Sequence, residues 1–477
     1  MGFGGLYISI SGLQANKRSL ETVSHNISNA NNSNYVRQGA IHVSNSYTNS
    51  MDSRFQVGTG VSIQQIRQIR DEFLDIKFRR EMATFGYHKA KSELLADVES
   101  IFNEIPDSGL QKIMDGFWDK WNELYKEADS LPIRGLVHES AIAFTDTVNH
   151  MSTQLDNIQQ NLNKKIVTTV NDINNTLDKI ASLNKKIKVI ESSNNVMKAN
   201  DYRDERNALL DKLSGILPIS CYENNLGEAI VSLQGKDLVS GSNFNSISIE
   251  NDEKGLANIY WKDSKDKIDL NGLGELCGLI DVRDGSVKEY INRLDVLVKT
   301  IATEINNIHR TGLDLQGNTN IDFFVPADGS INASNIRVNP ILSDFNKIAA
   351  SKTLDKGDGD IAKAIHDLRK ETLYGKFDPS KPFDDPANKD MNIDEFYNDL
   401  IAVLGIERES SRGTAETQAF LINQINEDRK GISSVSLDEE MTDMIKYQHS
   451  YVANSRVINA VDEMIENVVN RLGLVGR

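Results

Sequence analysis

Residues 436–472 read SLDEEMTDMIKYQHSYVANSRVINAVDEMIENVVNRL. Apolar residues recur in this stretch at steps of three and four, a spacing that keeps them on one face of a helix in a coiled coil. Ser436 and Glu439 have the spacing of a capping box, which predicts that the helix begins there. The apolar stripe comprises Met441, Ile445, Val452, Ile458, Val461, Ile465, Val468 and Leu472.

A second stripe with the same spacing lies near the beginning of the chain and comprises Leu6, Ile10, Leu13, Leu20 and Ile27. The asparagine-rich segment 29–34 predicts the end of this helix, because asparagine favours turns and helix caps. Neither terminal helix has a neighbour in sequence that could cover its apolar face. We therefore predict that the two helices pair as a coiled coil, and that the two stripes form an assembly interface rather than an ordinary core.

The chain between the two ends is predicted to be mostly helical. Helical periodicity indicates helices over 67–102, from about 109, over 136–190, 276–309, 361–370, 392–404 and 414–428. Short alternating segments predict an extended arm at 40–44 and 60–64, and β-strands between 217 and 273. The 8 prolines and 7% aromatic residues suit long helices.

These patterns predict a mainly α fold with a small β-rich insertion, in an elongated multi-domain subunit with discontinuous domains. The predicted divisions are an N-terminal helix and extended arm at 1–65, a long-helix body at 66–216, a β-rich subdomain at 217–273, a second helical part of the body at 274–431, and a C-terminal coiled-coil helix at 432–477. The first and last of these are expected to pair.

Composition excludes several classes of protein. The net charge of -16 argues against a nucleic-acid surface, which requires clustered Lys and Arg. The basic segment 67–80 is interpreted as a solvated helix face. No stretch approaches the roughly 18 apolar residues that insert into a membrane, and the beginning of the chain lacks the pattern of a cleaved signal peptide. Composition alone favours a cytosolic protein.

No catalytic motif has a specific spacing, because the sequence contains no H-E-x-x-H, G-x-S-x-G or phosphate-binding loop. We predict that the chain is not an enzyme and needs no cofactor. Oxygen-bearing side chains cluster at Asp314–Asp322 and Asp355–Asp360, but both segments lack the complete calcium-loop pattern. We interpret them as ordinary turns, with a cation site as the alternative.

Both ends resemble the flagellar rod, hook and hook-associated protein family. The N-terminal resemblance lies in Ser11-Gly-Leu13, Asn26-Ile-Ser-Asn29-Ala-Asn31 and Asn34-Tyr35-Val-Arg37-Gln. The C-terminal resemblance lies in Val435-Ser-Leu-Asp438-Glu439-Glu440 and in Ile445-Lys-Tyr-Gln448 with Tyr451-Val-Ala-Asn454. Asn32-Ser-Asn34 replaces the usual Thr-Pro-Gly. Internal stretches, including Asp201–Leu213, resemble the hook-associated members.

The resemblance implies a structural subunit at the junction between hook and filament, exported through the flagellar type III apparatus to the outside of the cell. Its implied partners are copies of itself in a ring, the hook protein, a second junction protein (hook-associated protein 3) and an export chaperone, without nucleic acid or membrane insertion. The alternatives are an intracellular coiled-coil adaptor, and a surface hydrolase displayed on a flagellar scaffold, which would need a catalytic cluster within 217–273.

Overall fold

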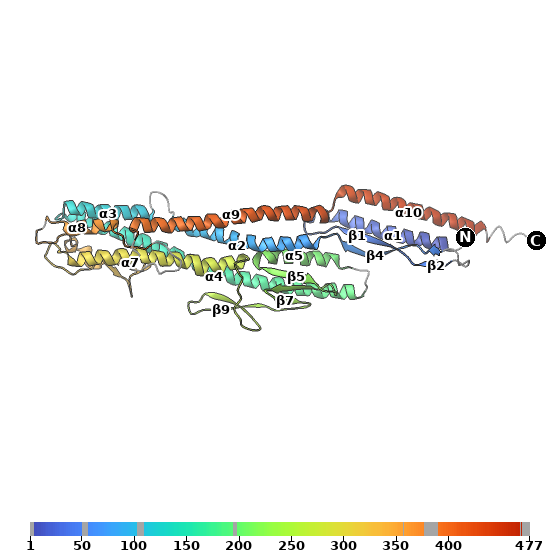
Figure 1. The fold of residues 1–477 in the computed structure, drawn as a ribbon, viewed down its shortest axis with the longest axis horizontal. Helices are drawn as coiled ribbons and strands as arrows, with labels where there is room; N and C mark the ends of the chain where they lie inside the picture. Colours follow the sequence, from blue (N-terminus) through green and yellow to red (C-terminus); the bar gives the residue numbers. More distant parts are fainter. Residues whose placement is uncertain are drawn as a thin grey trace, which may run out of the picture.

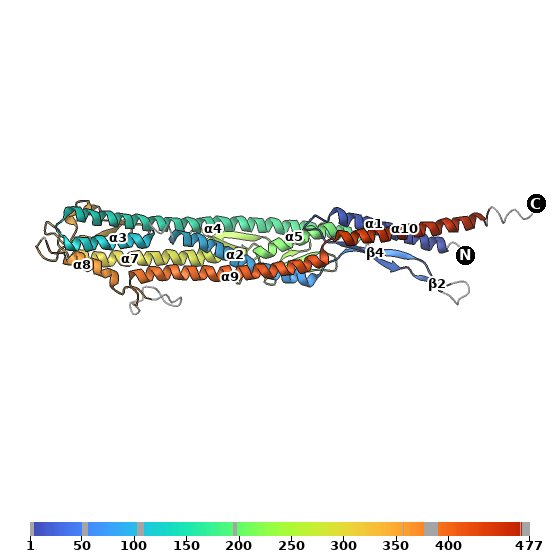
Figure 2. The ribbon, with the colours of Figure 1, turned by 90° about the horizontal axis from the view of Figure 1, so that it is seen from above.

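The molecule is a long rod of helices that run along its length, with both chain termini at the same end (Figure 1). The computed structural model describes residues 4–49, 56–102, 109–193, 198–355, 357–375, 390–467 and 469. A thin unit made from the two ends of the chain extends beyond a thicker body, and the view from above shows the same arrangement (Figure 2). We call these two parts the terminal unit and the body.

The helices account for most of the fold. The terminal unit contains α1 (Gly4–Ser28) and α10 (Leu437–Glu466), and the body contains α2 (Glu72–Phe102), α3 (Leu110–Lys126), α4 (Leu131–Ser193), α5 (Asn200–Ile216), α6 (Glu275–Asp281), α7 (Val287–Thr311), α8 (Asp360–Asp367) and α9 (Ile393–Ser433). A π-helical turn, η1 (Val282–Ser286), joins α6 to α7, and short 3-10 turns are present at η2 (Pro340–Ser343), η3 (Phe345–Lys347) and η4 (Leu368–Lys370).

The strands form small antiparallel sheets. In the terminal unit β1 (Gln38–Ser44) pairs with β4 (Val61–Gln68), and β2 (Tyr47–Asn49) pairs with β3 (Gln56–Gly58). The insertion contains a sheet in the order β5 (Ile219–Glu223), β6 (Ala229–Leu233), β7 (Lys236–Ser240) and β8 (Asn243–Phe244), beside the pair β9 (Ile247–Asn251) and β10 (Ala257–Trp261). The last pair is β11 (Phe324–Pro326) with β12 (Ile336–Val338).

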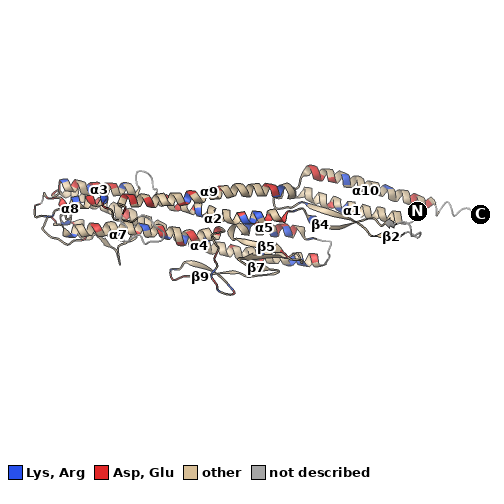
Figure 3. Cartoon of the chain, in the orientation of Figure 1, with Lys and Arg blue, Asp and Glu red and all other residues tan. Residues whose placement is uncertain are grey.

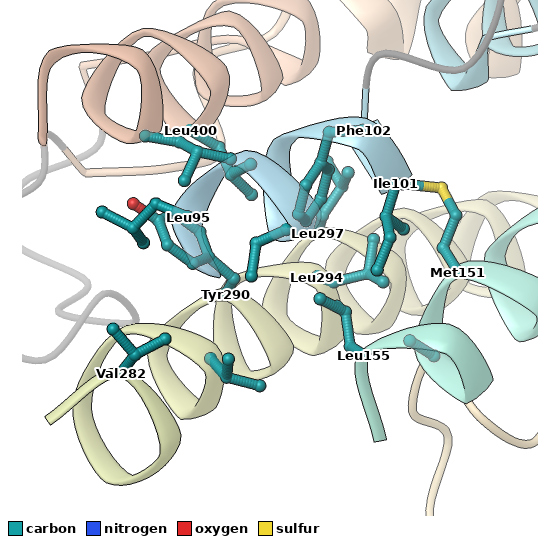
Figure 4. Packing of buried hydrophobic residues seen from close by; sticks show 14 of the residues in the cluster. Leu95, Ile101, Phe102, Met151, Leu155, Val282, Tyr290, Leu294, Leu297 and Leu400 are labelled. Carbon is teal, nitrogen blue, oxygen red and sulfur yellow. The ribbon is translucent and has the colours of Figure 1, made fainter. Parts of the chain in front are cut away.

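One continuous apolar core runs through the body and includes the inner face of the β-rich insertion. Figure 4 shows its centre, where Leu95 and Phe102 of α2, Leu155 of α4, Leu297 of α7 and Leu400 of α9 pack together. No described residue of α1 or α10 belongs to this core. The terminal unit must therefore be held to the body by other means.

The helix expected at 136–190 is longer than predicted, since α4 has 63 residues and so extends for about 95 Å at the usual helical rise. The helices expected separately at 392–404 and 414–428 are one helix, α9, and the break between them was wrong. Gly413 costs the helix only about 1 kcal/mol, and Arg412 bridges Glu409 and Glu416 across that turn. The predicted fold class is confirmed.

Candidate functional site: a polar junction between the chain ends and the body

α1 and α10 pack antiparallel, so Asn26 lies opposite Glu440 and Gly12 lies opposite Asn454. The side chains of α1 that this pairing buries are small or polar, namely Ser9, Gly12, Ala15, Ser19, Thr22, Val23 and Asn26. A Cβ added to Gly12 would approach the side chain of Asn454 to 2.8 Å. Small side chains thus permit the close approach of the two helices.

The pairing of the ends is as predicted, but the face that joins them is not the predicted stripe. On α1 the buried positions precede the predicted ones by one residue, a rotation of about 100°. Ile10 is consequently exposed, while Leu6, Leu13, Leu20 and Ile27 are only half-buried. The sequence pattern favoured large apolar residues, whereas close contact between two helices favours small ones.

The same rotation occurs in the first half of α10. Met441, Ile445 and Val452 are exposed, with Ile445 retaining 51% of its accessible surface. Glu440, Met444, Tyr447 and Tyr451 take the inner positions instead. Further along, Ile458, Val461 and Ile465 are half-buried as the stripe predicts. Val468 and Leu472 lie outside the described residues.

The extended arm is attached to the middle of α1 by Ser11 of the N-terminal motif. The Ser11 hydroxyl accepts a hydrogen bond from the Val61 N–H at 3.1 Å and donates one to the Ile8 carbonyl at 2.7 Å. Gly60 has a φ of +109° and lies against Ser11 so closely that a Cβ there would overlap the hydroxyl. Glycine is therefore required where β4 begins.

Asn26 is the centre of the network that closes the terminal unit. Its side-chain oxygen accepts hydrogen bonds from the Tyr35 hydroxyl at 2.7 Å and the Gln38 N–H at 3.0 Å. Its side-chain nitrogen donates to the Gln38 carbonyl at 2.9 Å and to the Glu440 carboxylate at 3.0 Å. One buried amide thus joins α1, the arm and α10. Burial and nearby carboxylates, with Asp201 and Asp204 first among them, raise the pKa of Tyr35, so its hydroxyl remains a donor.

Arg37 holds the beginning of α10. Its guanidinium donates to the buried Glu440 carboxylate at 2.6 Å and to the exposed Glu439 carboxylate at 2.6 Å. Its backbone N–H donates to the Ser433 carbonyl at the end of α9. Burial lowers the pKa of Arg37, because it disfavours the charged guanidinium. The hydrogen bond and the negative charge of Glu440 outweigh this effect, so the pKa of Arg37 is raised.

The predicted capping box at Ser436 and Glu439 was wrong, although α10 does begin where it predicts. Ser436 is the N-cap residue, but its side chain makes no capping hydrogen bond. Arg37 attracts Glu439 more strongly than the neutral backbone does, because charge-assisted hydrogen bonds are the stronger kind. A complete capping box is found instead at the beginning of α9, between Asn392 and Glu395.

The first turns of α5 bind the arm to the body. Asp204 accepts hydrogen bonds from the Val36 N–H at 3.1 Å and from the Gln68 side chain. Asn200 donates to the Gln38 side chain and to the Ile66 carbonyl, both at 3.1 Å. Asp201 accepts from Gln38 at 3.1 Å. The internal motif at 201–213 therefore meets the N-terminal motif and the arm that follows it.

Asp204 is the most perturbed acid of this junction. Burial raises its pKa to about 7, and this outweighs the opposing effects of the Val36 N–H and Arg70. Of the acids in this junction, Asp204 is therefore the one whose charged form is most disfavoured by the loss of solvent.

The remaining motif residues lie outside the network. Asn29 caps the last turn of α1 through the His25 carbonyl, and Asn31 is exposed in the turn that follows. Asp438 and Gln448 are exposed on α10, and Tyr451 is half-buried, as is Asn454 beside Gly12. Gln38, Asn200 and Asp204 belong to the network although they were not predicted as site residues. The available signal was that Gln38 and Asp204 lie within quoted motifs and Asn200 directly precedes one.

In both oxygen-rich loops, described carboxylates accept hydrogen bonds from nearby backbone N–H groups, as in turns. The Asp314 carboxylate accepts hydrogen bonds from the Gln316 and Asn318 N–H groups, and Asp358 accepts from those of Lys352, Thr353 and Asp360. Among the described residues no group of three His, Cys, Asp or Glu side chains converges as metal ligands would. Within the same residues no helix is both long and apolar enough to cross a bilayer.

The fold and this junction define a class: elongated helical subunits whose two ends close together as one unit. Both ends of the chain match families of flagellar proteins. Residues 6–35 match the flagella basal body rod protein family, and residues 432–472 match the flagellar basal body rod FlgEFG protein C-terminal family. Residues 95–324 match the helical domain of the flagellar hook-associated protein FlgK.

Individual relatives make the assignment specific. Flagellar hook-associated protein 1 of Bacillus subtilis is 30% identical over 100% of this chain and 99% of its own length. The protein of the same name from Salmonella typhimurium is 21% identical over 97% of this chain and 98% of its own. A solved structure of the flagellar hook junction protein FlgK from Burkholderia pseudomallei shares the fold, with a TM-score of 0.64 at 12% identity, covering 76% of this chain and 100% of that one.

The chain belongs to the flagellar hook-associated protein 1 family. It is a structural subunit of the bacterial flagellum, at the junction of hook and filament. This confirms the family and function that the terminal motifs predicted, and it sets aside the intracellular adaptor.

Proposed function

We propose that the terminal unit is the part through which copies of this chain assemble with one another in a ring. The observation that carries the proposal is the row of exposed apolar side chains on the outer face of α10, with Met441, Ile445 and Val452 at helical spacing. Ile10 adds a further exposed apolar side chain on α1. A pair of helices that leaves such faces uncovered is typical of a surface that another helix covers.

The division of labour that we propose follows the predicted divisions. Segments 1–65 and 432–477 form the assembling unit, and 66–216 with 274–431 form a rigid spacer that carries the β-rich 217–273 insertion. The separation of the terminal unit from the apolar core supports this division. The insertion is an accessory surface and not a catalytic domain, so the chain acts without enzymatic activity.

The partners that we propose are other copies of the chain, the hook protein on one side and the second junction protein on the other, outside the cell. Family membership supports contact with hook and filament components. An export chaperone would bind α10, because its exposed apolar row needs cover before assembly.

The experiment is negative-stain microscopy of a strain that lacks the gene. We expect hooks without filaments, and filaments restored by the wild-type gene. Filaments of normal number in the deletion strain would refute the junction role.

A further inference from the structure

The basic segment 67–80 is not the uniform solvated face that its sequence suggests. Arg70 pairs with Asp75, and Arg79 pairs with Asp211 at 2.6 Å, so both are used inside the subunit. Lys77 and Arg80 are exposed and make no ion pair with any described residue. Both charges are therefore available to another molecule.

An exposed aromatic side chain lies on the same face as these two charges. Phe73 keeps 71% of its surface accessible, and Ile76 is also exposed. Residues 73, 76, 77 and 80 share one side of a helix, because they follow the spacing of helical neighbours. We call Phe73, Ile76, Lys77 and Arg80 the basic face of α2.

α9 carries a face of opposite charge. Phe420 keeps 70% of its surface accessible, and Glu416 and Glu427 lie on the same side of the helix. Asp428 is exposed beside Glu427. The ion pairs of Glu416 with Arg412 and of Glu427 with Lys430 are exposed and lie within α9, so they contribute little. We call Glu416, Phe420, Glu427 and Asp428 the acidic face of α9.

The two faces point to opposite sides of the subunit. α2 and α9 pack against each other, with Arg429 bonded to Asp75 at 2.8 Å and stacked on the Phe78 ring at 4.3 Å. Phe73 is just over half a helical turn from Asp75, so the two side chains leave α2 on opposite sides. Phe420 is about two and a half turns from Arg429, so these two side chains also leave α9 on opposite sides. Each face is therefore on the far side of its helix from the contact between α2 and α9.

One charged residue of each face, Lys77 and Glu427, also lies at the same level of the rod. Lys77 follows Asp75 by two residues and Glu427 precedes Arg429 by two, and the helices are antiparallel. Both are thus displaced from the Asp75–Arg429 bridge by about 3 Å in the same direction. Figure 3 marks in blue the Lys and Arg positions along α2 and α5, in the part of the rod where α9 approaches its end.

From these relations we propose that the basic face of α2 binds the acidic face of α9 on the next copy of this chain. The inference rests on the ring of copies proposed above. A rotation about an axis along the rod keeps each element at its level, so Lys77 of one copy meets Glu427 of the next. The contact is heterologous, because different faces meet, and a heterologous contact repeated around an axis gives a ring where the rotation between neighbours closes.

The chemistry of the two faces is matched. Two unpaired cations meet a face with a carboxylate at the same level, and each face adds one exposed phenylalanine. An aromatic residue surrounded by charged groups is a usual composition for a protein interface. The charges fix the partner and the register, and the aromatic residues contribute apolar burial.

Cross-linking tests the contact directly in assembled flagella. A variant in which the native cysteines are replaced, C221S and C277A, carries Lys77→Cys and Glu427→Cys and is treated with a short bismaleimide in purified hook–filament junctions. We expect a ladder of dimers and larger species from the double variant and only monomer from either single variant. The matched control pairs Lys77→Cys with Arg412→Cys, which is exposed on α9 but about 22 Å further along. It should give monomer only.

Charge reversal tests the same contact by function. Lys77→Glu with Arg80→Glu should reduce the number of filaments at least about tenfold, because like charges at an interface are strongly unfavourable. Adding Glu427→Lys and Asp428→Lys in the same chain should restore filaments. Thermal melting of the purified monomers should stay unchanged, because all four side chains are exposed.

The outcomes separate the two proposals. If the wild-type gene restores filaments while the cysteine pair gives no ladder in the resulting junctions, the face-to-face contact is wrong and the junction role stands. Normal filament number with Lys77→Glu and Arg80→Glu would overturn the contact in the same way. Filaments that form without the gene would refute the junction role itself.

Discussion

The side-chain amide of Asn26 donates a hydrogen bond to the carboxylate of Glu440, a residue 414 positions further along the chain, at 3.0 Å. Both side chains are buried, and Glu440 is 1% exposed. The bond joins the N-terminal and the C-terminal motif of the family. The two motifs are therefore one structural site, divided between the ends of the sequence.

Replacing Asn26 with Ala should destabilise the terminal unit by about 2 to 3 kcal/mol, because it leaves several buried polar groups without partners. Amide exchange at Gln38, whose N–H binds the Asn26 oxygen, measures the local effect, while thermal melting of the body should not change. The control is Asn29→Ala, which loses one exposed bond and should cost less than about 0.5 kcal/mol. Equal effects of the two changes would contradict a central role for Asn26.

Gly12→Ala should weaken the pairing of α1 with α10 by about 1 to 3 kcal/mol, because the new methyl group overlaps the Asn454 side chain. Asn454→Ala should relieve this overlap, so the double variant should exchange its α1 amides more slowly than Gly12→Ala alone. Hydrogen exchange of α1 gives both values. Additive effects would show that the two residues do not touch.

Asp204 predicts a pH dependence of the attachment between arm and body. Its pKa is about 7 in the folded chain against an ordinary 3.8, so the folded chain holds a proton that the unfolded chain has released. The stabilisation is complete below pH about 4 and is lost as pH rises through 7, by on the order of 4 kcal/mol in total. Denaturant-induced unfolding measured across this pH range should show the free energy of unfolding decrease as pH rises.

An amide does not titrate, so Asp204→Asn should abolish the slope of stability against pH. Any change in stability that the substitution itself causes should be the same at every pH. Carbon-13 titration of the wild-type carboxyl gives the pKa independently. A midpoint near 4 would mean that the bonds from Val36 and Gln68, rather than burial, dominate this group.

Ile445→Asp and Ile458→Asp separate assembly from folding. Ile445 is exposed, so the aspartate should leave the monomer's melting unchanged and still prevent filament formation. Ile458 is half-buried within the terminal unit, so Ile458→Asp should destabilise that unit by about 1 to 3 kcal/mol. It should therefore also increase amide exchange in α1. If flagella that carry Ile445→Asp have normal filaments, the exposed apolar row of α10 is not part of the assembly surface.

Much of this architecture follows from local patterns. The periodicity of α4 and α7 and the alternation of β5, β6 and β10 depend on side chains that meet one apolar core, so sequence spacing predicts them well. The rotation of α1 by one residue could not be predicted, because it depends on how closely Gly12 and Ser19 let α10 approach. The gap expected between the helices at 392–404 and 414–428 is also absent, and Gly413 is exposed and tolerated within α9.

The polar junction was only partly visible in the sequence. The motifs identified Asn26, Tyr35, Arg37 and Glu440, but no local rule indicates that α5 meets the arm. Asp204 and Asn200 acquire their partners only after the body has folded. Long-range hydrogen bonds of this kind leave no periodic signal.

The closure of Asn26 and Arg37 on Glu440 has a consequence for copies that are cut short. A chain that stops before residue 440 can still build the apolar core of the body, yet its buried Asn26 amide and its Arg37 guanidinium find no carboxylate. The segment that carries Glu440 thus completes the fold of the N-terminal segment, and a chain cut before it could not form the polar junction that the assembled subunit needs.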